Sequence, residues 1–335
     1  MKPATVFSCA LTTLIASSLL NAAEPAPKPL AKEFDNPCGI TVQPTTGHLF
    51  VAARDGIYRV DPATGQKFAE VTGYPTDIYG KGPKYNVGPM GVAFVNGVLA
   101  VGDGSRPDAQ ELVRFYQVGT KPAAKPVEET SAVATVGPIV GGEASAKGEG
   151  NFYAIAVKGN DVYITANGDD TKGWVLKSGF ESGKAAELTP HLATKPEVGV
   201  DAPVGITVGP KGELVIGQMG EVNVPGDSLL TIYDADSKKL LKSYKTGLHD
   251  IAGLAYSPKT GKLYAVDFAW VDVTQGGLFE LTVSGDEVKA TKVASLLKPT
   301  ALTFGADGSL FVTIFGDTEA GNPAPGSVVK FAPGL

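Results

Sequence analysis

The chain has 335 residues, with 29 Lys and Arg against 35 Asp and Glu, which gives a net charge of −6. It contains no basic run interleaved with aromatic residues, and this pattern excludes nucleic acid as an expected partner. Its two cysteines, Cys9 and Cys38, are too few for a fold held together by disulfides.

The first 23 residues have the pattern of a secretory signal peptide. A positive start at Lys2 is followed by 17 uncharged, mostly apolar residues from Ala4 to Leu20, and the small pair Ala22 and Ala23 precedes Glu24. A membrane anchor needs about 20 apolar residues. No later stretch is long and apolar enough to span a bilayer. We therefore expect a secreted or periplasmic protein, cleaved near Ala23, in which residues 24–335 form one domain and Cys38 is the remaining cysteine.

One sequence motif recurs along that domain. It begins with a very small residue in an alternating apolar run, has a turn at a glycine or asparagine, and ends in a second apolar run. Two examples are "GITVQPTTGHLFVA" at 39–52 and "ALTFGADGSLFVT" at 301–313. Period-two alternation separated by tight turns is typical of β-strands. Outer strands such as "LLTIYD" follow. Six copies of a four-strand unit predict an all-β, six-bladed propeller. The small residues, expected to crowd around the central channel, are Gly39, Gly91, Ala154, Gly205, Gly253 and Ala301.

The two ends of the chain are predicted to close the ring. The last repeat stops after its third strand, "SVVKFAPGL", whereas the segment Leu30–Phe34 precedes the first repeat and belongs to no unit. This segment can supply the missing outer strand of the sixth blade. A blade shared by both termini leaves no open sheet edge in the ring.

The repeated units resemble those of known propellers. "GITVGPKGELVIG", "GLAYSPKTGKLYAVD" and "ALTFGADGSLFVT" are similar to NHL repeats and, more distantly, to the gluconolactonase-like (senescence-marker) propellers. The resemblance implies a ligand face formed by the loops that enter the first strands and those that join second to third strands. In the gluconolactonase-like family, carboxylate and amide residues at the entrances of the first strands hold a divalent metal. The matching positions carry neither group; they are Cys38, Met90, Tyr153, Val204, Ala252 and Thr300.

The loops on the expected ligand face are long and acidic, with aromatic residues among them. Carboxylates and amides near aromatic rings suit a calcium ion or a polar ligand such as a carbohydrate, although Asp and Asn also cap ordinary turns. The candidate ligand-binding residues are Asp103, Asn167, Asp169, Trp174, Asp250, Asp267, Trp270 and Asp317, and the possible calcium ligands are Asp103, Asp250 and Asp267. The same face carries Asp108, Asn151, Asp170, Asp201 and Glu221.

We therefore predict a recognition or scaffold module that binds a small-molecule, carbohydrate or protein ligand through this acidic loop face at the channel mouth. The alternative is a calcium-dependent hydrolase or lactonase of the gluconolactonase-like type with a rearranged metal site. The two hypotheses differ in what they require at the mouth: the enzyme needs a rigid acidic and aromatic pocket holding an ion, and the binder needs a broad loop surface.

Overall fold

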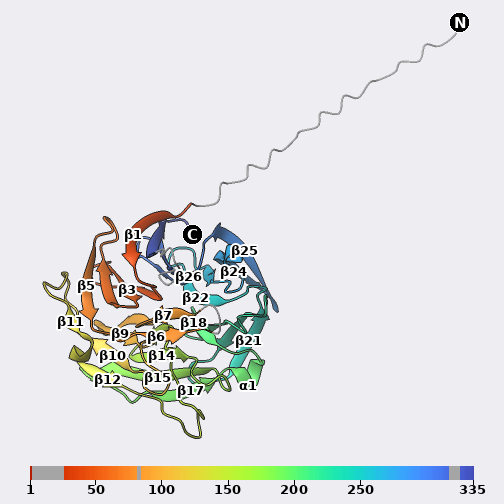
Figure 1. Ribbon diagram of the computed structural model, residues 1–335. Coiled ribbons are helices and arrows are strands. Elements are labelled where there is room, and N and C mark those ends of the chain that lie inside the picture. Colours follow the sequence, from red (N-terminus) through yellow and green to blue (C-terminus); the bar gives the residue numbers. More distant parts are fainter. Residues whose placement is uncertain (2–25, 81–83, 317–324) are drawn as a thin grey trace.

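The computed structural model is a ring of six β-sheets arranged as the blades of a propeller around a central axis (Figure 1). It describes residues 1, 26–80, 84–316 and 325–335. Apart from Met1, the predicted signal peptide lies outside the described residues, as does Asp317. No helix among the described residues has the length and apolar character needed to cross a bilayer.

Each blade has four main antiparallel strands, numbered from the axis outward. Blade one contains β2 (Gly39–Val42), β3 (Leu49–Ala53), β4 (Gly56–Val60) and β5 (Lys67–Thr72); blade two contains β8 (Val92–Val95), β9 (Val98–Gly102), β10 (Val113–Tyr116) and β12 (Ala134–Val136); blade three contains β13 (Ile155–Lys158), β14 (Asp161–Ala166), β15 (Trp174–Glu181) and β17 (Thr189–Ala193). Blade four contains β18 (Pro203–Val208), β19 (Leu214–Gln218), β20 (Leu229–Tyr233) and β21 (Leu240–Lys245); blade five contains β22 (Ile251–Tyr256), β23 (Leu263–Asp267), β24 (Gly277–Ser284) and β25 (Glu287–Ser295).

Short elements decorate this frame. The strand β11 (Val127–Glu128) pairs in parallel with β5, and β16 (Lys184–Ala185) extends blade three. One α-helical turn, α1 (Lys195–Val198), and two 3₁₀ turns, Glu129–Ser131 and Val273–Gln275, are the helical elements among the described residues.

The sixth blade closes the ring as predicted. Its strands are β26 (Pro299–Phe304), β27 (Leu310–Ile314), β28 (Gly326–Phe331) and, on the outside, β1 (Lys28–Phe34), which pairs antiparallel with β28. Phe34 is 1% exposed and packs in a core cluster with Phe311 and Val328. Both ends of the domain thus pair in one sheet, and this pairing closes the ring.

The predicted crowding at the axis is also confirmed. A Cβ added to Gly205 would lie 3.1 Å from the backbone of Gly253, and one added to Gly253 would lie 3.2 Å from the Cα of Ala301. Inner strands of successive blades therefore approach each other through their backbones. Larger side chains pack further out, between neighbouring blades, as Val215 and Leu254 do.

An additional hairpin lies near the axis, where the sequence indicated only a long loop. It consists of β6 (Asp77–Tyr79) and β7 (Tyr85–Val87), which follow blade one and precede β8. Its two tyrosines contact aromatic rings from blades three, five and six. The hairpin therefore reaches across the centre of the ring, where Figure 1 draws it.

Candidate functional site: an acidic pocket beside a plugged channel mouth

The channel mouth on the long-loop face is filled by aromatic side chains. Tyr85 of the hairpin lies 5.3 Å from the ring of Trp270 and 5.1 Å from that of Phe315, measured between ring centroids. Tyr79 meets Tyr153 at 5.7 Å and Trp270 at 5.9 Å. Offset edge contacts of this kind are favourable between aromatic rings. We call this group the aromatic plug; it separates the central channel from the loop face.

Beside the plug is a cavity of about 460 Å³, the acidic pocket, lined by the hairpin and by loops of blades two, three and four. Five carboxylate residues and one lysine line it among the described residues: Asp77, Asp108, Asp170, Asp201, Glu221 and Lys147. Asp201 is paired with Lys195 at 2.6 Å. The other four carboxylates face the pocket with Lys147 as the single cationic side chain among the described lining residues.

The carboxylates of the acidic pocket repel one another. The pKa of Asp108 is raised to about 6, first because surrounding protein removes water from the carboxyl and then because Asp77 and Asp170 carry like charge. The carboxyl of Glu111 lies beside Gly150, as that of Asp108 does, and burial raises the pKa of Glu111 to about 10, so that it is neutral at pH 7. Glu111 accepts a hydrogen bond from the backbone N–H of Asn151, a pocket residue. The negative charge is therefore concentrated at the cavity surface.

Two of the sequence-predicted residues, Asn167 and Trp270, line the acidic pocket directly. Asp169 and Trp174 shape its loops. The Asp169 carboxylate accepts hydrogen bonds from the backbone N–H groups of Ala146 at 2.7 Å and Lys147 at 3.3 Å, and the indole of Trp174 donates to the carbonyl of Ala144 at 3.2 Å. These bonds fix the loop that carries Lys147 beside the cavity.

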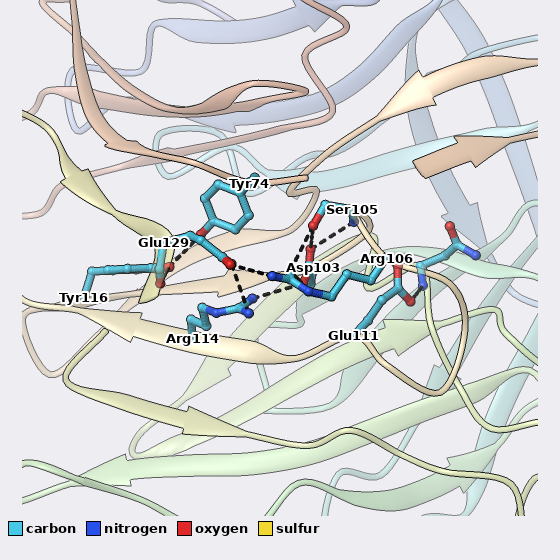
Figure 2. A network of polar contacts seen from close by, with 9 residues as sticks. Tyr74, Asp103, Ser105, Arg106, Glu111, Arg114, Tyr116 and Glu129 are labelled. Atoms are coloured by element: carbon cyan, nitrogen blue, oxygen red, sulfur yellow. Dashed lines mark hydrogen bonds and ion pairs between the residues drawn. The ribbon is translucent and has the colours of Figure 1, made fainter. Parts of the chain in front are cut away.

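Asp103 is held in a buried ion-pair network rather than presented to a ligand (Figure 2). Its Oδ2 lies 2.6 Å from Nη1 of Arg106 and 3.0 Å from Nη1 of Arg114, and its Oδ1 accepts from the N–H of Ser105 at 2.9 Å. Both arginines also reach Glu129. A buried carboxylate paired twice in this way anchors the long loop of blade two.

Asp250 and Asp267 likewise bond to the backbone of blade five. Asp267 accepts from the N–H groups of His249 at 3.0 Å and Asp250 at 2.6 Å, and Asp250 accepts from the N–H of Trp270 at 2.6 Å. Burial, and then the charge of Asp267, raise the pKa of Asp250 to about 7. Within the described part of the chain, no three His, Cys, Asp or Glu side chains are grouped to hold a metal ion. The calcium site stays a prediction that these contacts do not support.

Sequence reasoning missed the contribution of the hairpin to this site. Asp77 and Tyr79 line the acidic pocket, but the sequence predicts their segment, 76–87, only as one of the long loops of the ligand face. A signal was present. The alternating residues Asp77–Tyr79 and Tyr85–Val87 are separated by a short stretch containing two glycines, a pattern that favours a β-hairpin.

Comparison with known proteins supports the architecture. No protein-family model matches the chain, and no curated protein matches it in sequence. Among solved structures, a glucose dehydrogenase superposes with a TM-score of 0.60 at 14% identity, covering 92% of this chain and 100% of the other. The PQQ-bound aldose sugar dehydrogenase of Streptomyces coelicolor gives 0.60 at 16% identity, covering 90% and 96%. A protein assigned as a gluconolactonase gives 0.57 at 12% identity, covering 93% and 94%.

These structural neighbours are six-bladed propellers of the gluconolactonase and aldose sugar dehydrogenase type. At such identities the likeness establishes the fold alone, because propellers carry many unrelated functions. The resemblance to NHL repeats rests on the repeated phrases and stays a prediction.

Proposed function

We propose that the protein is a recognition module that binds a small organic cation in the acidic pocket. The observation that carries the proposal is geometric: the carboxylates of Asp77, Asp108, Asp170 and Glu221 line one cavity, in which Lys147 is the single cationic residue that faces them among the described lining residues. A cation placed among these groups reduces the repulsion between like charges and gains direct attraction to each carboxylate. The pocket is therefore complementary to positive charge before any ligand arrives.

The remaining lining of the acidic pocket supports an organic cation over a bare ion. Tyr79 and Trp270 contribute aromatic surface to the same cavity, and aromatic faces attract ammonium groups. The volume of about 460 Å³ falls in the range typical of small-molecule sites. An alkyl- or aryl-ammonium compound uses the carboxylates and the rings together, whereas a metal ion uses only the carboxylates.

The residues do not fit the cofactors associated with the neighbouring folds. A lactonase-type metal would need oxygen ligands at the first-strand entrances, but Cys38, Met90, Tyr153, Val204, Ala252 and Thr300 line an apolar channel there. PQQ, named in one neighbour, is an anionic quinone, and the described lining of the acidic pocket offers it five carboxylates against one lysine. We therefore derive no catalytic step through a metal or a quinone.

The test is isothermal titration with benzyltrimethylammonium, which joins a fixed positive charge to an aromatic ring. We expect saturable binding at one site. Asp108→Asn and Asp170→Asn should each weaken it by about tenfold, a loss of about 1.4 kcal/mol. Affinity should also fall as the pH drops through about 6, because Asp108 becomes neutral there. The matched control is Asp286→Asn, an exposed carboxylate in the β24–β25 turn that pairs with Lys242.

Titration with glucose in parallel separates the main rival ligand class. If glucose binds, and the aspartate substitutions do not change the affinity for benzyltrimethylammonium, the site recognises a polyol and the cation proposal fails. If neither probe binds at millimolar concentration, or if Asp286→Asn weakens binding as much as Asp108→Asn, the acidic pocket is not a cation site.

A further inference from the structure

The central channel contains a second cavity, of about 330 Å³, separate in chemistry from the acidic pocket. Two successive rings of small residues from the inner strands line it. The first contains five of the six residues of the predicted ring, all but Gly205: Gly39, Gly91, Ala154, Gly253 and Ala301. The second lies two residues further along each inner strand, where side chains point to the same face, and consists of Thr41, Ala93, Ala156, Thr207, Ala255 and Thr303. Because the inner strands carry small residues at both positions, the axis is left hollow.

The channel lining is uncharged. None of its described residues is an Asp, Glu, Lys, Arg or His. Its polar side chains are neutral and partly engaged: the Thr300 hydroxyl donates to the carbonyl of Pro37 at 2.8 Å, and the Cys38 thiol lies 3.5 Å from the carbonyl of Asn36. A charged ligand would lose its hydration here without gaining a partner.

The channel is closed at the long-loop face by the aromatic plug. Tyr85 and Phe315 of the plug, together with Phe268, which contacts both rings, are buried and line the cavity. Tyr79, Met219 and Trp270 line both cavities and so form the wall between the channel and the acidic pocket. Access to the channel is therefore from the opposite face, where short turns join the first and second strands of each blade.

We propose that the central channel is a second binding site, which takes a small uncharged hydrophobic molecule. Apolar cavities stay dry and bind apolar ligands, and an engineered cavity of about 150 Å³ already accepts benzene. The channel is about twice that volume. A compact molecule of one to a few rings matches both the volume and the lining.

The test uses N-phenyl-1-naphthylamine, an uncharged probe whose fluorescence rises in apolar surroundings. We expect saturable binding of one probe to the folded wild-type protein, with energy transfer from Trp270, which lines the cavity. Ala255→Leu, in the second ring, fills the channel and should weaken binding by about tenfold or more. The matched control is Ala290→Leu, a half-buried alanine on β25 of the same blade, outside the channel lining, which should bind as the wild type does.

A second measurement covers the case in which Ala255→Leu does not fold. Crystals of the wild-type protein under xenon pressure should show xenon on the propeller axis between the two rings. The proposal is wrong if the probe does not bind, if Ala255→Leu and Ala290→Leu bind it equally well, or if xenon does not enter the channel. Benzyltrimethylammonium binding should be unchanged in Ala255→Leu, so this site and the acidic pocket can fail independently.

Discussion

Replacing Phe34 with alanine tests whether β1 holds the ring closed. Phe34 ends β1, is 1% exposed, and contacts the ring of Tyr58 in blade one at 5.6 Å between centroids. It also packs with Phe311 and Val328 of blade six. One side chain thus joins the first and last blades. Truncating a fully buried phenylalanine costs about 3–5 kcal/mol, from lost burial and the cavity left behind.

The loss is measured by urea unfolding followed by far-UV circular dichroism, together with the melting temperature. In a domain of this size, each kcal/mol of lost stability lowers the melting temperature by about 1.5 °C. The expected loss therefore lowers the melting temperature by about 5–8 °C. Phe115→Ala is the matched control inside blade two, whose four strands come from one continuous stretch, and it should cost a similar amount. Lys32→Ala, on the exposed side of β1, should cost almost nothing.

A loss below about 1 kcal/mol for Phe34→Ala, the ordinary effect of an arbitrary substitution, would refute the closure argument. Deleting residues 24–34 is the more drastic version. It leaves β28 as an unpaired edge, so the deletion variant should aggregate. A deletion variant that remains monomeric and melts with the wild type would contradict the role assigned to β1.

Four further predictions concern the axis, the thiol and the carboxylates. Gly205→Val should lower the free energy of unfolding by about 1–3 kcal/mol through overpacking, whereas Gly212→Val should act through backbone strain, since Gly212 has a φ of +84°; equal unfolding curves for wild type and both variants would contradict this. Cys38 should resist iodoacetamide at pH 8 in a Cys9→Ser background until the protein is unfolded, because burial raises the pKa of its thiol to about 12; rapid labelling of the folded protein, measured by mass spectrometry, would disprove it. Asp250 binds its proton more tightly when folded than when unfolded, so its contribution lowers stability as the pH rises from about 4 to about 7, and Asp250→Asn should flatten that slope in denaturation curves. Calcium at millimolar concentration should leave the melting temperature of the metal-free protein unchanged, because the three aspartates suggested as its ligands already bond to the protein; a rise would restore the calcium hypothesis.

The positions of the strands could be read from local sequence. In "GITVGPKGELVIG" the alternation of apolar residues marks two strands, and Gly212 between them has the positive φ that the tight turn requires. Both features depend on neighbours within a few residues. The unit recurs at intervals of 48 to 63 residues, and the number of copies gave the number of blades. The segment Leu30–Phe34, which belongs to no copy, was correctly predicted as the closing strand.

The candidate site could be predicted only as a face of the molecule. Asp103 and Asp108 belong to the same long loop, yet one is locked between Arg106 and Arg114 while the other lines the acidic pocket. Nothing in the local pattern distinguishes them. The difference comes from which partners the folded loop brings within reach.

Only the tertiary structure decided that the channel mouth is plugged and that the acidic pocket lies beside it. Tyr85 follows blade one in the chain, but its ring packs against Trp270 and Phe315, which come from blades five and six. Such contacts exist only in the closed ring, which brings Tyr85 next to residues 185 and 230 positions further along the chain. Strand positions depend on the pattern of neighbouring residues and can be predicted from sequence. Contacts between loops of different blades depend on how the whole chain folds.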